Sequence, residues 1–229
     1  QAFNLCDEII SNNYFAKDQI IKKNKNLASK ISVIWNFVDF KSINLRANKS
    51  LNYPDFFDFK KPLIVSVGNL TTIKDRSTLI KAFHILNLKI PSNLVILGDG
   101  PNRVKCEKLI IELGLSNSVF LIGQNINPYS WIKNSDLYVS SSLSEGCPNN
   151  IIESIILKKK IVATDCKGDT SRLLKSTKNS KLVKVGDFKA MAQAFELMLS
   201  KSIRESPSTK NFIEIIKKSP KKYIEILCL

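Results

Sequence analysis

The fold is decided by the run Leu63-Ile64-Val65-Ser66-Val67, a nearly continuous apolar segment that Gly68 follows directly. A short run of this kind, without polar alternation, predicts a strand buried on both faces of a sheet. An amphipathic helix is predicted next, over about 76–88. A second apolar run, 93–97, is closed by Gly98-Asp99-Gly100-Pro101 and leads into another predicted helix. Strands and helices therefore alternate along this part of the chain, as in βαβ units.

The same alternation continues to about residue 185. Further strands are predicted at 119–122, 137–140, 161–164 and 182–185, with helices at 128–133 and 149–158. Apolar strands separated by helices indicate an α/β fold, a doubly wound, Rossmann-like parallel sheet with right-handed crossovers. Ligands of such sheets bind beyond the carboxyl ends of the strands. Four residues fall there: Gly68, Gly98, Gly123 and Glu145.

The regions on either side of this pattern differ from it. Residues 1 to about 40 hold two predicted strands, 6–10 and 31–34, and one helix, which is too little for a sheet of their own. We expect them to end a preceding domain. Residues 44–58 are polar and linker-like, and helices are predicted beyond Ser200, at 212–218 and 223–227. Because the chain begins with Gln rather than Met, we expect a fragment or a processed product.

One segment places two carboxylates across a predicted helix start: Glu145-Gly146-Cys147-Pro148-Asn149-Asn150-Ile151-Ile152-Glu153. Proline suits the first helical turn, because its missing N–H costs nothing there. The free N–H groups of Asn149 and Asn150, with the positive end of the helix dipole, form an anion site suited to a phosphate. Glu153 lies on the same side as Asn149, and carboxylates accept hydrogen bonds from sugar hydroxyls. The alternative is an acidic helix start that only stabilises the helix.

Composition excludes several classes of site. The five cysteines are scattered and odd in number, with no C-x-x-C pair, which argues against a zinc site and a disulfide framework and favours a reducing compartment. The single histidine, His84, falls within a predicted helix and is interpreted as an ordinary helix residue. We therefore expect no metal site built from histidine.

The net charge of +15 has two readings. The basic residues are mostly lysines spread along the chain, with little aromatic interleaving, which argues against a nucleic-acid-binding module. Much of the excess is interpreted as a solvated surface in a composition rich in Lys, Asn and Ile. Attraction to phosphorylated ligands or to an anionic membrane surface is the weaker, functional interpretation. No apolar run approaches the roughly 20 residues that span a bilayer. No signal peptide is visible.

Several stretches follow one another in an order that resembles a known family. They are 67–75 (Val-Gly-Asn-Leu-Thr-Thr-Ile-Lys-Asp), 95–101, 119–123, 135–139, 144–154 and the crossover-like run 30–39. Together they resemble the C-terminal half of the retaining, nucleotide-sugar-dependent glycosyltransferases of family 4, which have the GT-B fold. The resemblance covers about residues 5–200 and is greatest to enzymes of capsular, lipopolysaccharide or glycan-lipid assembly. It implies four parts: an N-terminal remnant of the acceptor domain with the crossover (1–45), a linker (46–61), the nucleotide-sugar-binding domain (62–204) and C-terminal helices (205–229).

The resemblance also implies roles for individual residues. Lys74 occupies the position of a lysine that pairs with the donor diphosphate. Glu153 matches the carboxylate that holds the ribose hydroxyls, and Glu145 matches the catalytic-site residue that faces the donor sugar. The other implied donor-binding positions are Gly68, Asn69, Gln124, Gly146, Cys147, Pro148, Asn149 and Asn150. Gln124 would belong to the base-reading loop, although an ordinary turn residue is the alternative.

Two departures from the family pattern stand out. Asn69 replaces the usual arginine, so one charge-assisted diphosphate contact, worth about 1.5–3 kcal/mol, is missing. Arg76 or Arg103 would have to reach in to replace it. In addition, Asp169-Thr170-Ser171-Arg172 stands where the family has a turn like Gly-Pro-Arg-Glu.

The resemblance thus implies transfer of a hexosyl or N-acetylhexosaminyl group, with retention, from a UDP- or GDP-sugar to a glycan or lipid-linked acceptor. No cofactor or metal is implied, because lysine and the helix dipole supply the positive charge. The expected location is the cytoplasm, with peripheral contact to the anionic inner face of the plasma membrane. Asn69 and the missing half leave open a non-catalytic or decayed nucleotide-sugar-binding fragment.

Overall fold

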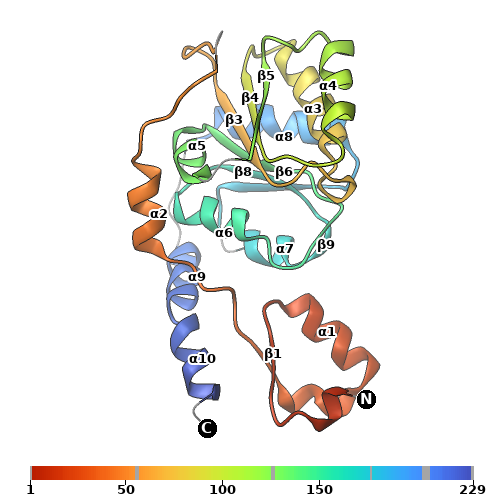
Figure 1. Cartoon of the computed structure of the whole chain (residues 1–229), viewed down its shortest axis with the longest axis vertical. Helices are drawn as coiled ribbons and strands as arrows, with labels where there is room; N and C mark the ends of the chain where they lie inside the picture. The colour runs from red at the N-terminus through yellow and green to blue at the C-terminus, as the bar shows by residue number, and fades with distance from the viewer. Residues whose placement is uncertain (1, 55–56, 125–126, 176, 203–206, 228–229) are drawn as a thin grey trace.

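A six-stranded parallel sheet forms the centre of the computed structural model, which describes residues 2–54, 57–124, 127–175, 177–202 and 207–227 (Figure 1). Its strands are β3 (Leu63–Val67), β4 (Asn93–Leu97), β5 (Val119–Gly123), β6 (Leu137–Ser140), β8 (Ile161–Thr164) and β10 (Ser180–Val183). They lie in the order β10-β8-β6-β3-β4-β5, and every neighbouring pair is parallel. The predicted doubly wound sheet is confirmed.

The strand order reverses beside β3. The chain runs outward from β3 through β4 to β5, then returns to the other side of β3 and continues through β6 and β8 to β10. The connection that leaves the carboxyl end of β3 therefore leads toward β4, whereas the one that leaves β6 leads the opposite way, toward β8. A crevice at such a switch point is where doubly wound sheets bind their ligands.

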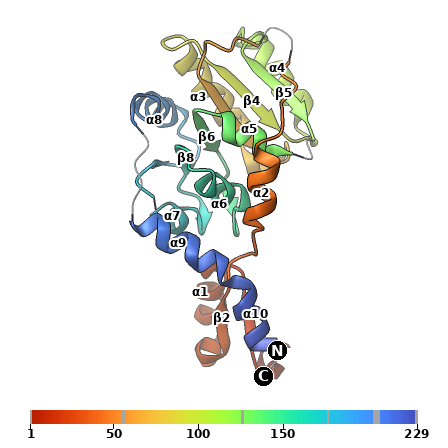
Figure 2. The same ribbon diagram turned by 90° about the vertical axis from the view of Figure 1, so that its left-hand side faces the viewer.

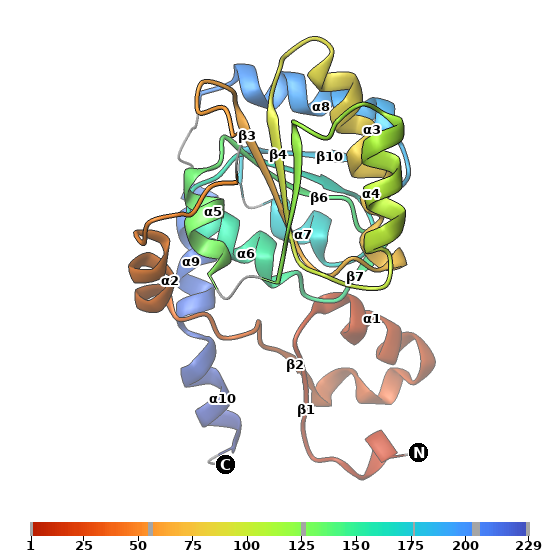
Figure 3. The same ribbon diagram turned by 45° about the horizontal axis from the view of Figure 1, so that its top comes forward.

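Helices cover both faces of the sheet because successive strand residues point to opposite faces. Ile64 packs in one core with α3 (Arg76–Asn87), α4 (Arg103–Glu112) and α8 (Phe188–Ser200). Its neighbour Val65 packs in the other core, with α5 (Pro128–Asn134), α6 (Asn149–Ile156) and α7 (Thr170–Leu174) (Figure 3). Strands buried on both faces explain the unbroken apolar runs.

The N-terminal part forms a small sheet of its own, contrary to our expectation. It contains η1 (Ala2–Leu5), β1 (Ile9–Ser11), α1 (Tyr14–Lys23), η2 (Lys25–Lys30) and β2 (Ile31–Val33). The strands β1 and β2 pair in parallel across the α1 crossover, over a cluster of Ile9, Leu27 and Ile31. This part lies beneath α7 and β9 (Lys167–Gly168) (Figure 1).

Other elements differ from the sequence-based expectation. The sequence predicts a linker-like stretch at 44–58, but residues 44–47 belong to the helix α2 (Phe40–Ala47), because Ile43 and Ala47 bury one side of it. The helices α7 and α8 were not predicted, although α8 carries a buried stripe that includes Met191 and Phe195. The last strand, β10, begins at Ser180 rather than near Leu182.

Two C-terminal helices, α9 (Pro207–Lys217) and α10 (Ser219–Leu227), extend the predicted helices 212–218 and 223–227 toward their N-termini. They run past α2 toward the N-terminal part (Figure 2). Phe212 of α9 packs edge-on against Trp35, with ring centroids 6.3 Å apart. Among the residues that the structure describes, no helix has both the length and the apolar character needed to cross a membrane.

Candidate active site

The loop that follows β3 lies at the switch point, beyond the carboxyl end of that strand. Gly68 N donates to Leu97 O (2.8 Å), which brings this loop onto the end of β4. A Cβ atom at Gly98 would lie 2.3 Å from Gly68 O, so only glycine permits this approach. The 3₁₀ turn η3 (Thr72–Lys74) follows in this loop and ends with Lys74.

Lys74 and Glu145 form an ion pair beside this loop. Lys74 Nζ lies 2.5 Å from Glu145 Oε1, and both side chains are mostly buried. Ser142 Oγ donates to the same carboxylate oxygen (2.6 Å). The backbone is held as well, because Ser141 Oγ donates to Lys74 O (2.8 Å) and Leu143 N donates to Ile73 O (2.7 Å). Two residues that the sequence indicates separately therefore form one ion pair.

A two-stranded ladder supports Glu145. The strand β7 (Ser144–Glu145) pairs in parallel with β9, so that Glu145 lies opposite Gly168. Gly168 has φ +128°, and a Cβ atom there would lie 1.4 Å from Glu145 O. Any side chain at position 168 would therefore displace the Glu145 backbone.

The start of α6 lies at the same switch point, beside the end of β3. Pro148 is the residue that caps the helix rather than part of its first turn as predicted, and its carbonyl accepts from Ile151 N (3.0 Å) and Ile152 N (3.3 Å). The N–H groups of Asn149 and Asn150 have no acceptor among the described residues. Asn150 Nδ2 donates to Val67 O (3.2 Å), which ties the helix start to the end of β3.

Glu153 lies one turn into α6 and faces α5 rather than Glu145. Burial raises the pKa of Glu153 to about 7, although a hydrogen bond from Tyr129 and the charge of Arg46 oppose the shift. Its Oε2 atom is buried without a hydrogen-bond partner among the described residues. Arg46 comes from α2, and its guanidinium lies 4.7 Å from the centre of the Tyr129 ring. The buried, unsatisfied oxygen is suited to accept a hydrogen bond from a ligand hydroxyl.

The two arginines expected to compensate for Asn69 lie in different places. Asn69 itself is exposed. Arg76 is only 3% exposed and lies behind the loop, where its Nη1 donates to Ser66 Oγ (2.5 Å) and its Nη2 to Gly68 O (2.8 Å). Burial lowers the pKa of Arg76. Arg103 instead binds Leu121 O (3.2 Å) and Glu107 (2.9 Å), away from Lys74. Arg76 thus places positive charge directly behind Gly68, and Arg103 does not.

The remaining predicted residues lie at the rim. Gln124 follows β5 and is exposed, and Gly146 is exposed as well. Cys147 is half-buried, and burial raises the pKa of its thiol to about 11, so that the thiol stays protonated at neutral pH. No group of three His, Cys, Asp or Glu side chains arranged to hold a metal ion occurs in the described ranges.

Sequence reasoning missed several residues that shape the site. Ser141 and Ser142 could have been noticed, because polar residues directly follow a predicted strand there. Tyr129 and Arg46 carried no signal, because their positions beside Glu153 depend on how α2 and α5 pack. Asp169 is 2% exposed and accepts from Tyr14 N (2.6 Å) and Phe15 N (2.8 Å) at the start of α1. It connects the N-terminal part to the loops of the site.

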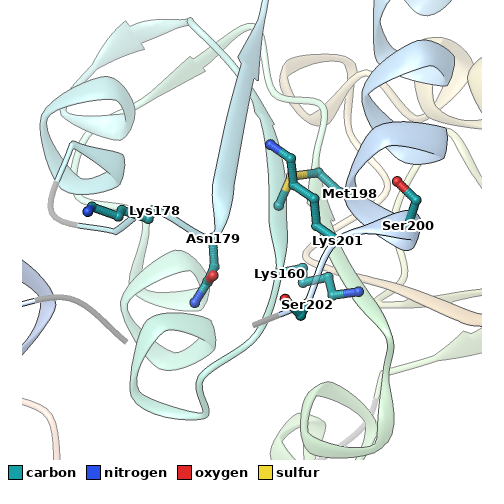
Figure 4. A pocket seen from close by; sticks show the side chains of 7 residues that line it. All are labelled: Lys160, Lys178, Asn179, Met198, Ser200, Lys201 and Ser202. Atoms are coloured by element: carbon teal, nitrogen blue, oxygen red, sulfur yellow. The ribbon is translucent and has the colours of Figure 1, made fainter. Parts of the chain in front are cut away.

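A cavity of about 400 Å³ lies at the opposite, amino edge of the sheet, and none of the predicted site residues line it (Figure 4). Its lining includes Lys160, Lys178 and Lys201 but no carboxylate. The three ammonium groups point in different directions, and Lys160 Nζ donates to Leu199 O (3.2 Å) (Figure 4). The charges therefore do not converge on one position.

Comparison with known sequences identifies relatives. The sequence model of the family described as Glycosyl transferases group 1 matches residues 54–219. An uncharacterized glycosyltransferase of Methanocaldococcus jannaschii is 34% identical over 152 residues, which are 66% of this chain and 37% of the relative. The N-acetylgalactosamine-N,N'-diacetylbacillosaminyl-diphospho-undecaprenol 4-alpha-N-acetylgalactosaminyltransferase of Campylobacter jejuni is 30% identical over 194 residues, 85% of this chain and 51% of that enzyme. The matched residues thus span 37% and 51% of the length of these two relatives.

Solved structures share the fold. The crystal structure of Anabaena HepE in complex with UDP and glucose matches with a TM-score of 0.81 at 18% identity, over 99% of this chain and 64% of that chain. A glycosyltransferase from Rickettsia africae matches with a TM-score of 0.80 at 21% identity, over 96% and 64% of the two chains.

Proposed function

The chain belongs to the family Glycosyl transferases group 1, with a fold of the GT-B type, and from this membership we propose that it is the donor-binding half of a sugar-transferring enzyme. The donor would be a nucleotide-diphosphate sugar and the acceptor a hydroxyl group. The observation that carries the proposal is the convergence of Lys74, Glu145 and the free N–H groups of α6 at the switch point of the sheet.

In the proposed reaction, the bond between the sugar and the diphosphate breaks while the acceptor oxygen bonds to the same carbon, and the hydroxyl proton passes to the departing diphosphate. Lys74 and the N–H groups of Asn149 and Asn150 stabilise the negative charge that develops on the departing diphosphate. Glu145 orients the sugar, and Glu153 accepts hydrogen bonds from the ribose hydroxyls. Attack from the face that the diphosphate leaves retains the anomeric configuration, as expected of a family 4 enzyme.

We further propose a UDP- or GDP-sugar carrying a hexosyl or N-acetylhexosaminyl group as donor, used without a metal ion. Two similar proteins support a UDP-sugar and a hexosyl or N-acetylhexosaminyl group: the HepE structure contains UDP and glucose, and the Campylobacter jejuni enzyme is named as an N-acetylgalactosaminyltransferase of a diphospho-undecaprenol acceptor. A glycan or lipid-linked acceptor, a cytoplasmic location and peripheral contact with an anionic membrane complete the proposal.

Calorimetric titration of UDP and GDP into the chain tests donor binding. We expect one of them to bind, and Lys74→Ala to weaken binding about 10- to 100-fold, because a charge-assisted contact is lost. Lys105→Ala, on the exposed side of α4, is the matched control and should bind as the wild type does. Absence of binding by the wild type, or unchanged affinity in Lys74→Ala, would contradict the proposal.

A second function, donor binding without turnover, is favoured by Asn69. Incubation of the chain with UDP-glucose, UDP-N-acetylglucosamine and GDP-mannose, with and without EDTA, separates the two functions. Transfer or hydrolysis that releases the nucleoside diphosphate, is insensitive to EDTA and yields an α-configured product by NMR supports the retaining enzyme. Binding with no release from any donor supports the second function.

A further inference from the structure

Four asparagines form a chain of hydrogen bonds from the N-terminal part to the start of α6. Asn13 Nδ2 donates to Asn12 Oδ1 (2.7 Å), and Asn12 Nδ2 donates to Asn36 Oδ1 (3.3 Å). Asn36 Nδ2 then donates to Asn149 Oδ1 (2.8 Å). This chain of hydrogen bonds thus links Asn36 to Asn149, which lie 113 positions apart in the sequence.

One end of this chain sets the direction of every amide in it. Asn13 Oδ1 accepts from Ala16 N (2.6 Å), as the cap of α1. A backbone N–H can only donate, so the oxygen of Asn13 is committed and its amide nitrogen must donate to the next residue. The same reasoning applies at each step. Asn149 therefore uses its oxygen within this chain of hydrogen bonds, and its Nδ2, which has no acceptor among the described residues, remains available as a donor.

This orientation matters at the position that Asn149 occupies. Asn149 is the first residue of α6, is exposed, and lies beside the unpaired N–H groups of the helix start. An amide presents either its oxygen, which repels a phosphate, or its nitrogen, which donates to one. The chain of hydrogen bonds leaves the amide nitrogen of Asn149 available. This side chain therefore adds a third donor to the two backbone N–H groups of the helix start.

We propose that Asn36 is a positioning residue of the donor site, which holds the Asn149 amide so that Nδ2 donates to the diphosphate of the nucleotide sugar. This inference rests on the proposed function, since it assumes that the diphosphate lies at the start of α6. It makes the N-terminal part of the chain a contributor to donor binding. It also supplies a diphosphate contact in a site where Asn69 provides no charge.

The test compares ligands with and without phosphates. Titrations use UDP, UMP and uridine, or the guanine series if GDP is the diphosphate that the wild type binds. We expect Asn36→Ala and Asn149→Ala each to weaken diphosphate binding about 10- to 100-fold and to leave nucleoside binding unchanged, as the loss of one hydrogen bond to a charged group predicts. The double variant should lose no more than Asn149→Ala, because Asn36 acts through Asn149.

A third variant tests the orientation itself. Asn36→Asp presents only acceptor oxygens to Asn149, so the Asn149 amide should turn and direct its oxygen toward the diphosphate. We expect a greater loss of diphosphate affinity in Asn36→Asp than in Asn36→Ala. Asn117→Ala, an exposed asparagine at the amino edge of the sheet, is the matched control and should show no change.

The outcomes distinguish this inference from the function on which it rests. No binding of UDP or GDP by the wild type would overturn both. Wild-type binding with unchanged affinity in the Asn36 and Asn149 variants would overturn this inference alone. Equal losses for the nucleoside and the diphosphate would show that Asn36 acts on the fold, which would overturn it as well.

Discussion

At the scale of single residues, Glu153 shows how burial changes a carboxylate. One oxygen lacks a partner, and burial raises the pKa of the side chain to about 7. Because its pKa in the unfolded chain is the ordinary value of 4.5, the folded protein binds more protons between pH 4.5 and 7. Stability therefore falls as pH rises through that window. A buried carboxylate with a raised pKa and an unpaired oxygen is characteristic of a functional site.

We predict that nucleoside diphosphate binding releases a proton from Glu153. Ribose hydroxyls that donate to Oε2 stabilise the ionised form and lower the pKa, so affinity should rise between pH 6 and 8. Calorimetry near pH 7, in buffers of different ionisation enthalpy, should show release of about half a proton from this group. Glu153→Gln should remove the proton release from this group. Proton release from the ligand's own phosphate occurs with both proteins, so it cancels in the difference between the wild type and the variant. Identical proton release by the variant would contradict this role of Glu153.

At the scale of elements, the start of α1 depends on a residue far along the chain. Tyr14 N and Phe15 N both donate to the Asp169 carboxylate, and Ala16 N donates to Asn13. The first three N–H groups of the helix are thus satisfied, two of them by α7's capping residue. Arg172 of α7 adds a cation–π contact with Tyr14 at 4.4 Å. Residues 169–172, which differ from the Gly-Pro-Arg-Glu-like turn of the family, are thus the residues that hold the start of α1.

We predict that Asp169→Ala destabilises the attachment of α1. Two half-buried N–H groups would lose their acceptors, at a cost of about 2–4 kcal/mol. Hydrogen exchange of residues 14–23 should become faster and urea denaturation should shift to lower concentration. Asp187→Ala removes only a local helix cap on α8, worth about 1 kcal/mol, and should leave exchange in α1 unchanged. Unchanged exchange in Asp169→Ala would show that the carboxylate does not hold α1.

At the scale of the whole molecule, the excess of positive charge remains largely unpaired. The net charge is +15, and most of the ion pairs formed by the described residues are exposed local pairs. The C-terminal helices carry exposed lysines, among them Lys221 and Lys222, on a part of the molecule that extends away from the main sheet (Figure 2). Such a surface attracts anionic lipid headgroups through long-range electrostatics.

We predict that the chain sediments with vesicles containing phosphatidylglycerol and not with vesicles of phosphatidylcholine alone, and that added salt releases it. The double variant Lys221→Ala/Lys222→Ala should bind more weakly, by about 1 kcal/mol per lysine. Lys105→Ala/Lys108→Ala removes the same charge from α4 and is the matched control. Equal binding to neutral vesicles, or equal loss in the control, would contradict membrane contact through the C-terminal helices.

The predicted strands agree with the structure where the prediction depends on a local run of apolar residues. The runs at 63–67, 93–97 and 137–140 became strands with the predicted bounds, because burial on both faces requires continuous apolar residues. The helix α8 was overlooked even though its apolar stripe has the helical period, so that signal was available. The sheet of β1 and β2 was not foreseeable from short runs alone, because pairing across α1 supplies its stability.

The sequence by itself determined the alternation of strands and helices, the glycines at the strand ends, and the helix start at Asn149, since each depends on neighbouring residues and a short period. Only the tertiary structure decided which of these features meet. Lys74 reaches Glu145 across 71 residues, and Asp169 reaches Tyr14 across 155. Packing also buries Glu153, which raises its pKa, beside Tyr129 of α5 and Arg46 of α2. Such contacts depend on the order of strands around the switch point and on how helices pack, which no local pattern records.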